Sequence, residues 1–280
     1  MTAATSTDQP PPGAGLLERV SFRGKVGATW LLMLALFVGL FLNFDLKLSV
    51  ILDKLPYLIG WRLAPDGFLQ GAAMTLYIWV LAGVGSFVLG LFAALGRLSR
   101  NAGAFGVSTF YTSFFRGTPL LVQIYLIYQG LPQIGLVLSA VASGVIALSL
   151  NYGAYQAEII RAGILAIPTG QREAATALGL TRWQTMRKII LPQAMRVIVP
   201  PTGNQMLALM KETSLVSIMG VWEMMFLARS YGRADYRYIE MMLTIAVLYW
   251  IMTLLLEWGQ RHIEQYYGKG YGGYGRQRSH

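Results

Sequence analysis

Residues 161–196 read RAGILAIPTGQREAATALGLTRWQTMRKIILPQAMR and lie between two long apolar segments. Pro168 and Thr169 predict the start of a short helix with Thr169 as its N-cap, because a hydroxyl there can accept a hydrogen bond from an unpaired backbone N–H. Gly179 adopts left-handed backbone angles without strain and is therefore expected to end this helix. A short helix is thus predicted in the middle of the loop.

A second helix is predicted directly after the glycine. Thr181 and Gln184 have the spacing of a capping box, and Pro192 is expected to end the helix that begins there. Two helices joined by a glycine turn are also typical of a helix-turn-helix unit that binds DNA. Such a unit needs a packed third helix and free access to a groove, whereas this one is tethered at both ends to apolar segments. Nucleic acid is therefore not predicted as a partner.

The composition is typical of a membrane protein. Of 280 residues, 55% are hydrophobic and only 13% are charged, and that charged share is about half the share in a soluble domain. The chain has no cysteine, and its two histidines, His262 and His280, both lie near the C-terminus. These counts argue against a disulfide framework, a metal site and a cysteine nucleophile. We expect neither a cofactor nor catalytic residues.

Six segments carry few or no charges over a length that can cross a hydrocarbon core of about 30 Å. They are residues 26–44, 71–96, 110–129, 131–159, 200–226 and 238–258. Gly117 and Pro119 should bend the third of them. A cleaved signal peptide is an alternative for the first, but its apolar run is longer than usual and no small-residue cleavage site follows it. An all-α membrane protein is therefore predicted.

The distribution of basic residues predicts the orientation of these segments. With the N-terminus inside, fifteen of the 23 Lys and Arg residues lie in the inner segments and six in the outer ones. Arg116 and Lys211, which lie in or near the membrane, are the remaining two. Both termini are therefore expected in the cytoplasm, and topology accounts for the net charge of +10.

The same pattern predicts the domain organisation. We expect a disordered cytoplasmic tail, an extra N-terminal transmembrane helix, an extracytoplasmic linker, a transmembrane domain that contains loop 161–196, and a second cytoplasmic tail. Their ranges are 1–25, 26–44, 45–66, 67–262 and 263–280.

Small residues recur every four positions in two segments, which lets helix backbones approach closely in lipid. They are Ala82, Ser86, Gly90 and Ala94 in one segment, and Ser139, Ser143, Ala147 and Asn151 in the other. The second stripe continues on the same side of the helix through Tyr155 and Glu158. Because a glutamate that faces lipid is costly, this side should face protein or water.

Polar residues also interrupt segment 200–226. Asn204, Lys211 and Ser214 fall on one side of a helix. A lysine inside the membrane is costly unless it faces water or a partner, and Glu158 is a candidate partner. Glu212 lies about 100° further round the helix, so it is not automatically paired with Lys211. A translocation path and a structural ion pair between helices would satisfy this pattern equally well.

The loop also matches a known signature. Its Glu173-Ala174-Ala175, Gly179 and Ile189-x-Leu191-Pro192 reproduce the EAA pattern E-A-A-x3-G-x9-I-x-L-P of ABC-importer permeases. Three further stretches are FRGTPLLVQ at 115–123, NYGAYQAE at 151–158 and KETSL at 211–215. With them, the chain resembles the polar amino-acid permeases that import histidine, glutamine, arginine or glutamate, over about residues 67–262.

Two features depart from this family's pattern. Glu212 stands where many members have aspartate, and segment 26–44 is additional to the usual five-helix core. The resemblance implies a type I ABC importer permease fold with five core helices and one extra N-terminal helix. The extra helix brings the N-terminus inside and leaves the core topology unchanged.

The resemblance further implies that the helix at Glu173, Ala174, Ala175 and Gly179 is a coupling helix that docks on a cytoplasmic ATPase. Helix propensity would explain the two alanines equally well, and a favourable charge near a helix N-terminus would explain Glu173. The chain has no G-x-x-x-x-G-K-[ST] sequence, so the energy must come from another chain.

The implied partners are an ATPase dimer, a second permease subunit (identical or homologous), an extracytoplasmic amino-acid-binding protein and the lipid of a bacterial cytoplasmic membrane. The expected function is that of the permease subunit of an ATP-driven importer of a polar amino acid. The residues expected along the translocation path or against the substrate are Arg116, Tyr155, Glu158, Asn204, Lys211, Glu212, Thr213 and Ser214.

Two other functions are considered. A membrane-embedded enzyme would need convergent catalytic groups, and the chain offers only carboxylates, Ser, Thr and Lys211 for them. A passive channel would have no use for the EAA loop. The charge of the substrate stays open, because Arg116 and Lys211 favour an anionic side chain whereas Glu158 and Glu212 favour a cationic one.

Overall fold

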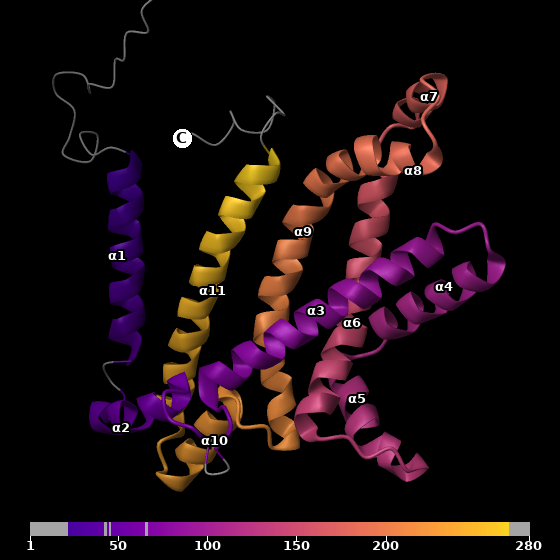
Figure 1. Cartoon of the computed structure of the whole chain (residues 1–280). Helices are drawn as coiled ribbons and strands as arrows, with labels where there is room; N and C mark the ends of the chain where they lie inside the picture. Colours follow the sequence, from indigo (N-terminus) through magenta and orange to yellow (C-terminus); the bar gives the residue numbers. More distant parts are fainter. Residues whose placement is uncertain (1–21, 42–43, 45, 65–66, 269–280) are drawn as a thin grey trace, which may run out of the picture. The chain divides into compact units, whose positions relative to one another are not determined.

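The computed structural model describes residues 22–41, 44, 46–64 and 67–268. Among these residues every regular element is a helix (Figure 1), and the one isolated β-bridge joins Gly71 to Glu223. The predicted all-α class is therefore confirmed. The chain divides into two compact units, residues 1–47 with 271–280 and residues 48–270, and each is described by itself.

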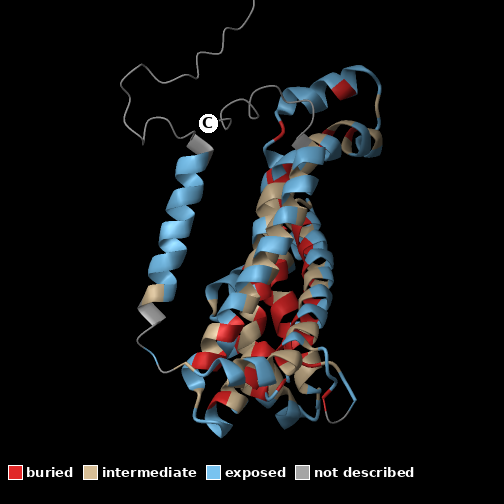
Figure 2. Ribbon diagram, turned by 90° about the vertical axis from the view of Figure 1, so that its left-hand side faces the viewer, coloured by how far each residue is buried: buried red, intermediate tan, exposed pale blue. Residues whose placement is uncertain are grey.

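The first unit contains α1, Phe22–Phe41. Its side chains from Gly24 to Val38 are exposed on all sides (Figure 2), and most of them are apolar. A helix that is apolar all round suits a lipid environment. The helix begins at Phe22 and so includes the last residues of the expected tail 1–25. The rest of that tail, residues 1–21, lies outside the described residues.

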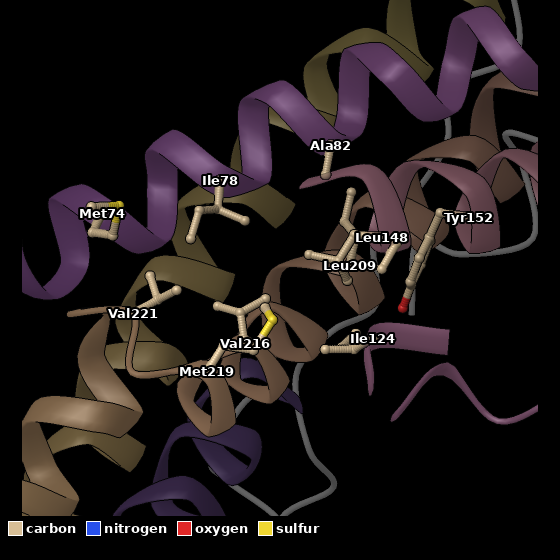
Figure 3. Close-up of a cluster of buried hydrophobic side chains, with 11 residues drawn as sticks. Met74, Ile78, Ala82, Ile124, Leu148, Tyr152, Leu209, Val216, Met219 and Val221 are labelled. Atoms are coloured by element: carbon tan, nitrogen blue, oxygen red, sulfur yellow. The ribbon is translucent and has the colours of Figure 1, made fainter. Parts of the chain in front are cut away.

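The second unit is built around α3, Gly71–Arg97, and α6, Ala140–Leu165. The predicted stripe of α3 is buried, and so are Ser143, Ala147 and Asn151 of the second stripe, whereas Ser139 is exposed and precedes α6 as its N-cap. A Cβ atom added at Gly90 would lie 2.7 Å from Cβ of Gln156, so only glycine fits there. Met74, Ile78, Leu148 and Leu209 complete the core beside these stripes (Figure 3).

Segment 131–159 was predicted to be helical throughout, and its first part is not. Residues Leu131–Ile134 form a 3-10 turn, and Gly135 follows with a left-handed φ of 85°. The helix α6 begins only after Ser139, whose side chain accepts a hydrogen bond from the N–H of Ala142 (3.2 Å). Pro132 and the left-handed Gly135 therefore keep residues 131–138 out of helix α6.

The expected bend in segment 110–129 is a complete break. Helix α4, Ala102–Gly117, ends there, and α5, Leu120–Tyr125, begins after two residues in extended conformation, Thr118 and Pro119. A π-helical turn, Leu126–Gly130, follows α5. The proline fixes an extended entry and removes one backbone donor, which is why the helix does not continue.

The loop helices are α7, Thr169–Ala177, and α8, Arg182–Thr185. The N-cap of α7 is Pro168, which has no side-chain donor or acceptor, so the prediction of Thr169 as N-cap is wrong by one residue. The capping box is confirmed: Gln184 N–H donates to Oγ1 of Thr181 (3.3 Å), and Thr181 N–H donates to Oε1 of Gln184 (2.9 Å).

Pro192 does not end the second helix, contrary to the prediction. A π-helical turn, Met186–Ile190, leads directly into α9, Leu191–Glu212, and the proline lies in the first turn of α9. A proline is tolerated there because its missing N–H is not needed by the hydrogen-bonding ladder.

Segment 200–226 is not one transmembrane helix, because α9 ends at Glu212. A 3-10 helix, Thr213–Met219, ends at Gly220, whose φ of 79° is left-handed. The next helix, α10, Met224–Ala234, is capped by the buried carboxylate of Glu223. Lys211 and Glu212 are thus placed at the end of a helix and not at its middle.

The last helix, α11, Tyr238–Gly268, is longer than the predicted 238–258. It passes the boundary expected at residue 262, and the remaining part of the expected tail, 269–280, lies outside the described residues. By length and composition, Gly71–Arg97 and Tyr238–Tyr267 are each apolar enough to cross a membrane.

Helix α2, Leu48–Ile59, occupies the predicted linker 45–66. Figure 1 shows α2 and α10 at the end of this unit opposite α7 and α8.

Candidate functional site

The break between α4 and α5 creates the polar core of the site. The carbonyl of Phe115 would normally accept from the N–H of residue 119, which is a proline and has none. Instead, Nδ2 of Asn151 donates to this carbonyl at 2.9 Å, and Nε2 of Gln123 donates to it at 3.0 Å. Nε2 of Gln123 also lies 2.7 Å from Oγ1 of Thr118. Two buried amides therefore hold the broken backbone in place.

A pocket of about 530 Å³ opens beside this break. The break contributes residues 116–120, α6 contributes Asn151, Tyr152 and Tyr155, and α9 contributes Gln205, Ala208 and Glu212. Its volume lies within the usual range for small-molecule sites. The three parts are remote in sequence, so the pocket exists only in the folded chain.

The two charged side chains of the pocket have opposite signs. Arg116 comes from the end of α4, and its guanidinium lies over the ring of Tyr155, with Cζ 5.3 Å from the ring centroid. Glu212 comes from the end of α9. Three of the predicted path residues, Arg116, Tyr155 and Glu212, thus meet in one pocket.

Glu158 lies one turn beyond Tyr155 and outside this pocket. Its carboxylate accepts hydrogen bonds from Arg97 of α3 and Arg161 of α6, and Nη1 of Arg116 is 3.9 Å away. The predicted pairing of Glu158 with Lys211 is therefore wrong. Arg97 binds Glu158 in place of Lys211, because α3 packs along α6. The spacing of residues in the sequence does not reveal this packing.

The other predicted path residues do not line the pocket. Asn204 faces α11, where its Oδ1 accepts from Gln260 (3.3 Å), and Thr213 is fully buried and donates to the carbonyl of Met210 (2.6 Å). Lys211 is exposed and forms no ion pair within the described part of the chain. Ser214 belongs to the 3-10 helix after α9, so the predicted polar strip is interrupted.

The residues of the EAA motif are placed on α7 and the turn after it. Gly179 has a φ of 72°, and the N–H groups of Leu180 and Gly179 donate to the carbonyls of Ala175 (3.0 Å) and Thr176 (2.9 Å). This is the Schellman arrangement that ends a helix firmly. Glu173 and Ala174 are exposed, whereas Ala175 is fully buried against its own chain.

Sequence reasoning missed Gln123, Tyr152 and Gln205 as parts of this site. For Gln123 a signal was present in the sequence. Pro119 has no N–H, so the carbonyl of Phe115 lacks its helical donor, and the side-chain amide of Gln123 can replace that donor. We find no comparable signal for Tyr152 or Gln205, since both reach the pocket only through helix packing.

A bundle of apolar helices with a broken helix beside a polar pocket, and with short helices at one end (Figure 1), is typical of the membrane subunit of a transporter. Residues 86–268 match the family described as binding-protein-dependent transport system inner membrane component, and the chain belongs to this family. It is a permease subunit of an ABC importer. In this family the ATPase is a separate subunit, so the chain is not itself an enzyme.

Curated relatives cover most of the chain. It is 36% identical to the arginine transport system permease protein ArtQ of Bacillus subtilis strain 168, over 79% of this chain and 97% of that protein. It is 39% identical to the glutamine transport system permease protein GlnP of Escherichia coli strain K12, over 70% of this chain and 91% of that protein.

Solved structures show the same fold. A crystal structure of an amino acid ABC transporter with histidines has a TM-score of 0.71 and 37% sequence identity, and the match covers 79% of this chain and 99% of that one. An inward-facing structure of the MetNI methionine ABC transporter has a TM-score of 0.60 at 22% identity and supports the fold alone. The predicted permease fold is thus confirmed.

Proposed function

We propose that this subunit carries a polar amino acid into the cytoplasm, through a transporter that also contains a second permease subunit, two ATPase subunits and an extracytoplasmic binding protein. In this proposal α7 and both termini lie on the cytoplasmic side of the bacterial inner membrane. The relatives named for arginine and glutamine support this class of substrate. The distribution of basic residues supports the orientation.

The observation that carries the proposal is the pair of opposite charges in the pocket. An amino acid has a carboxylate and an ammonium group on one carbon atom. Arg116 can bind the carboxylate through a charge-assisted hydrogen bond, and Glu212 can bind the ammonium. The aromatic face of Tyr155 helps to hold the guanidinium of Arg116 in position.

The exposed side of α7 supports docking on an ATPase. Glu173 forms no ion pair among residues 67–268, and Leu178 at the end of α7 is 77% exposed. An exposed leucine at the end of a short projecting helix is available for contact with a partner, and the uncompensated carboxylate of Glu173 can pair with a basic residue there. Ala175 does not take part, because it packs inside its own chain, so we assign the partner contact to Glu173 and Ala174.

The proposal is tested by transport into proteoliposomes that contain the complete transporter, saturating binding protein and ATP. We expect Arg116→Gln and Glu212→Gln each to reduce the transport rate roughly tenfold or more, because a charged hydrogen bond contributes about 1.5–3 kcal/mol. Lys211→Gln is the matched control, since it removes an exposed charge next to Glu212 but outside the pocket.

Equal losses for Lys211→Gln and Glu212→Gln would contradict the pocket assignment. Uptake without ATP would support a passive channel, and chemical turnover of the substrate without the ATPase would support a membrane-embedded enzyme. A calorimetric screen of the cognate binding protein against the amino acids would identify the substrate.

A further inference from the structure

Helix α2, Leu48–Ile59, presents three different surfaces. Its first surface packs on the protein: Leu58 is completely buried in a cluster with Leu227 of α10 and Met241 of α11, and Val50 and Ile51 pack at its edge. This surface explains why the linker contains an ordered helix at all, since burial of one face stabilises a short helix that propensity alone would not.

Polar contacts reinforce the same surface. Nζ of Lys54 lies 3.5 Å from Oδ2 of Asp235, at the end of α10, and 5.4 Å from the ring centroid of Tyr231. The hydrogen bond with Asp53 and the nearby charge of Asp235 raise the pKa of the Lys54 ammonium, so it stays charged. The ring of Tyr57 packs edge-on against that of Tyr231, with centroids 5.9 Å apart.

The second surface of α2 is apolar and exposed. Leu48, Leu52 and Ile59 are 64%, 59% and 41% exposed, and their spacing places them within about 40° of one another round the helix. The third surface is polar and exposed, and it carries Ser49 and Asp53. It lies about 100° from the apolar one. The uncovered part of α2 is therefore itself divided into an apolar and a polar side.

The surroundings of α2 match the boundary of a bilayer. Figure 1 shows α2 running across the end of α11, a helix apolar enough to span the membrane. Beyond α2, Trp61 is 86% exposed and Leu63 is 58% exposed, and between them Nη1 of Arg62 donates to the hydroxyl of Tyr57 (2.8 Å). Tryptophan, tyrosine and basic residues are enriched at membrane interfaces, where one end of the side chain is apolar and the other is wet.

We propose that α2 and the following residues 61–63 form an interfacial membrane element, in which Leu48, Leu52, Ile59 and Trp61 insert between the lipids of the outer leaflet while Ser49 and Asp53 face water. The division of the uncovered surface argues for lipid over a protein partner. A partner protein would need to cover the apolar side without covering the polar side beside it, whereas the edge of a bilayer provides both environments at once. The element therefore fastens the outer ends of α10 and α11 to the membrane surface.

Site-directed spin labelling tests this proposal, because the chain has no cysteine to remove. The variants Leu52→Cys, Ile59→Cys, Ser49→Cys and Asp53→Cys are labelled in the complete transporter in proteoliposomes. The ratio of collisions with oxygen to collisions with a water-soluble nickel chelate is measured for each label. Phospholipids labelled in the headgroup and in the acyl chain calibrate this ratio.

We expect the ratio to be several-fold higher at residues 52 and 59 than at 49 and 53, because oxygen concentrates in lipid and the chelate stays in water. Equal ratios at 52 and 53 would overturn the proposal and place α2 in water. Labels at 52 and 59 that neither reagent reaches would also overturn it, since a second copy of the chain or α1 would then cover the apolar side. Leu48→Cys repeats the test should a label at 52 prevent assembly.

Discussion

Glu158 and Glu173 are both acidic residues near the loop end of the bundle, and their surroundings differ completely. Glu158, about two turns before the end of α6, is bound by Arg97 and Arg161 of its own chain and lies close to Arg116. Glu173, on α7, is exposed and forms no ion pair in the portion of the chain that the structure describes.

The difference separates two roles that sequence patterns alone cannot distinguish. A carboxylate that several guanidinium groups of its own chain already bind is not free to bind another protein. Removing it leaves those cations without their acceptor, which lowers the stability of the fold. A carboxylate on a firmly capped helix without a partner is available to another protein. We therefore expect Glu158 variants to act on stability and Glu173 variants to act on coupling.

The largest effect is expected for Glu173→Lys. Losing one charge-assisted contact and introducing repulsion should reduce substrate-stimulated ATP turnover roughly tenfold or more, since such a contact contributes about 1.5–3 kcal/mol. The free energy of unfolding should change by less than about 0.5 kcal/mol, because the side chain is exposed. ATP turnover in proteoliposomes and thermal unfolding of the purified subunit measure the two quantities.

Gln171→Lys is the control for that experiment, because it also places a lysine on α7, about 160° round the helix from Glu173. Normal ATP turnover in Glu173→Lys, or an equal loss in Gln171→Lys, would show that this side of α7 does not contact the ATPase.

An intermediate effect is expected for Glu158→Gln. The change removes the carboxylate charge that three guanidinium groups share. The Glu158 side chain is 27% exposed. We expect the free energy of unfolding to fall by about 1–3 kcal/mol, less than for a fully buried pair because water screens the charges. Thermal unfolding at low and high salt measures the loss, which should be smaller at high salt.

Glu257→Gln is the matched control, since the pair of Glu257 with Arg261 is longer, at 3.6 Å, and lies on the surface of α11. Its removal should change stability by no more than about 0.5 kcal/mol. If the two variants were equally stable, Glu158 would have no special structural role.

The smallest effect is expected for Thr181→Ala, which removes the capping box next to α7. Loss of an N-cap costs about 0.5–2 kcal/mol, and here it should appear as faster hydrogen exchange in residues 182–190 without unfolding of the bundle. Thr176→Ala is the control, because that hydroxyl donates to the carbonyl of Arg172 within α7 (2.9 Å) and does not cap the second helix. Exchange that is no faster in Thr181→Ala than in Thr176→Ala would show that the cap does not hold the second helix.

Prediction from sequence succeeded where the signal is local or periodic. The capping box at Thr181, the left-handed turn at Gly179 and the small-residue faces of α3 and α6 depend on residues within a few positions of one another. It failed at Pro192, because the proline lies in the first turn of α9, where its missing N–H is tolerated. It also failed at segment 200–226, because α9 ends at Glu212 and a 3-10 helix that stops at the left-handed Gly220 follows it.

The site was only partly predictable for a related reason. Arg116, Tyr155 and Glu212 stand out as polar residues in apolar surroundings, so sequence alone suggests them. The same criterion also selected Asn204, Lys211 and Glu158, which the structure places elsewhere. Composition shows that a polar residue needs a partner, but it does not show which partner.

The sequence by itself determined the class of this protein, the capped helices of its loop and the faces on which its helices pack, because each depends on short-range backbone preferences or on a simple period along one helix. Only the tertiary structure decided that Asn151 and Gln123 hold the carbonyl of Phe115, that Arg97 binds Glu158, and that Ala175 turns inward. Side chains far apart in the chain become neighbours only when helices cross at a particular register, and many weak contacts summed over the whole bundle set that register.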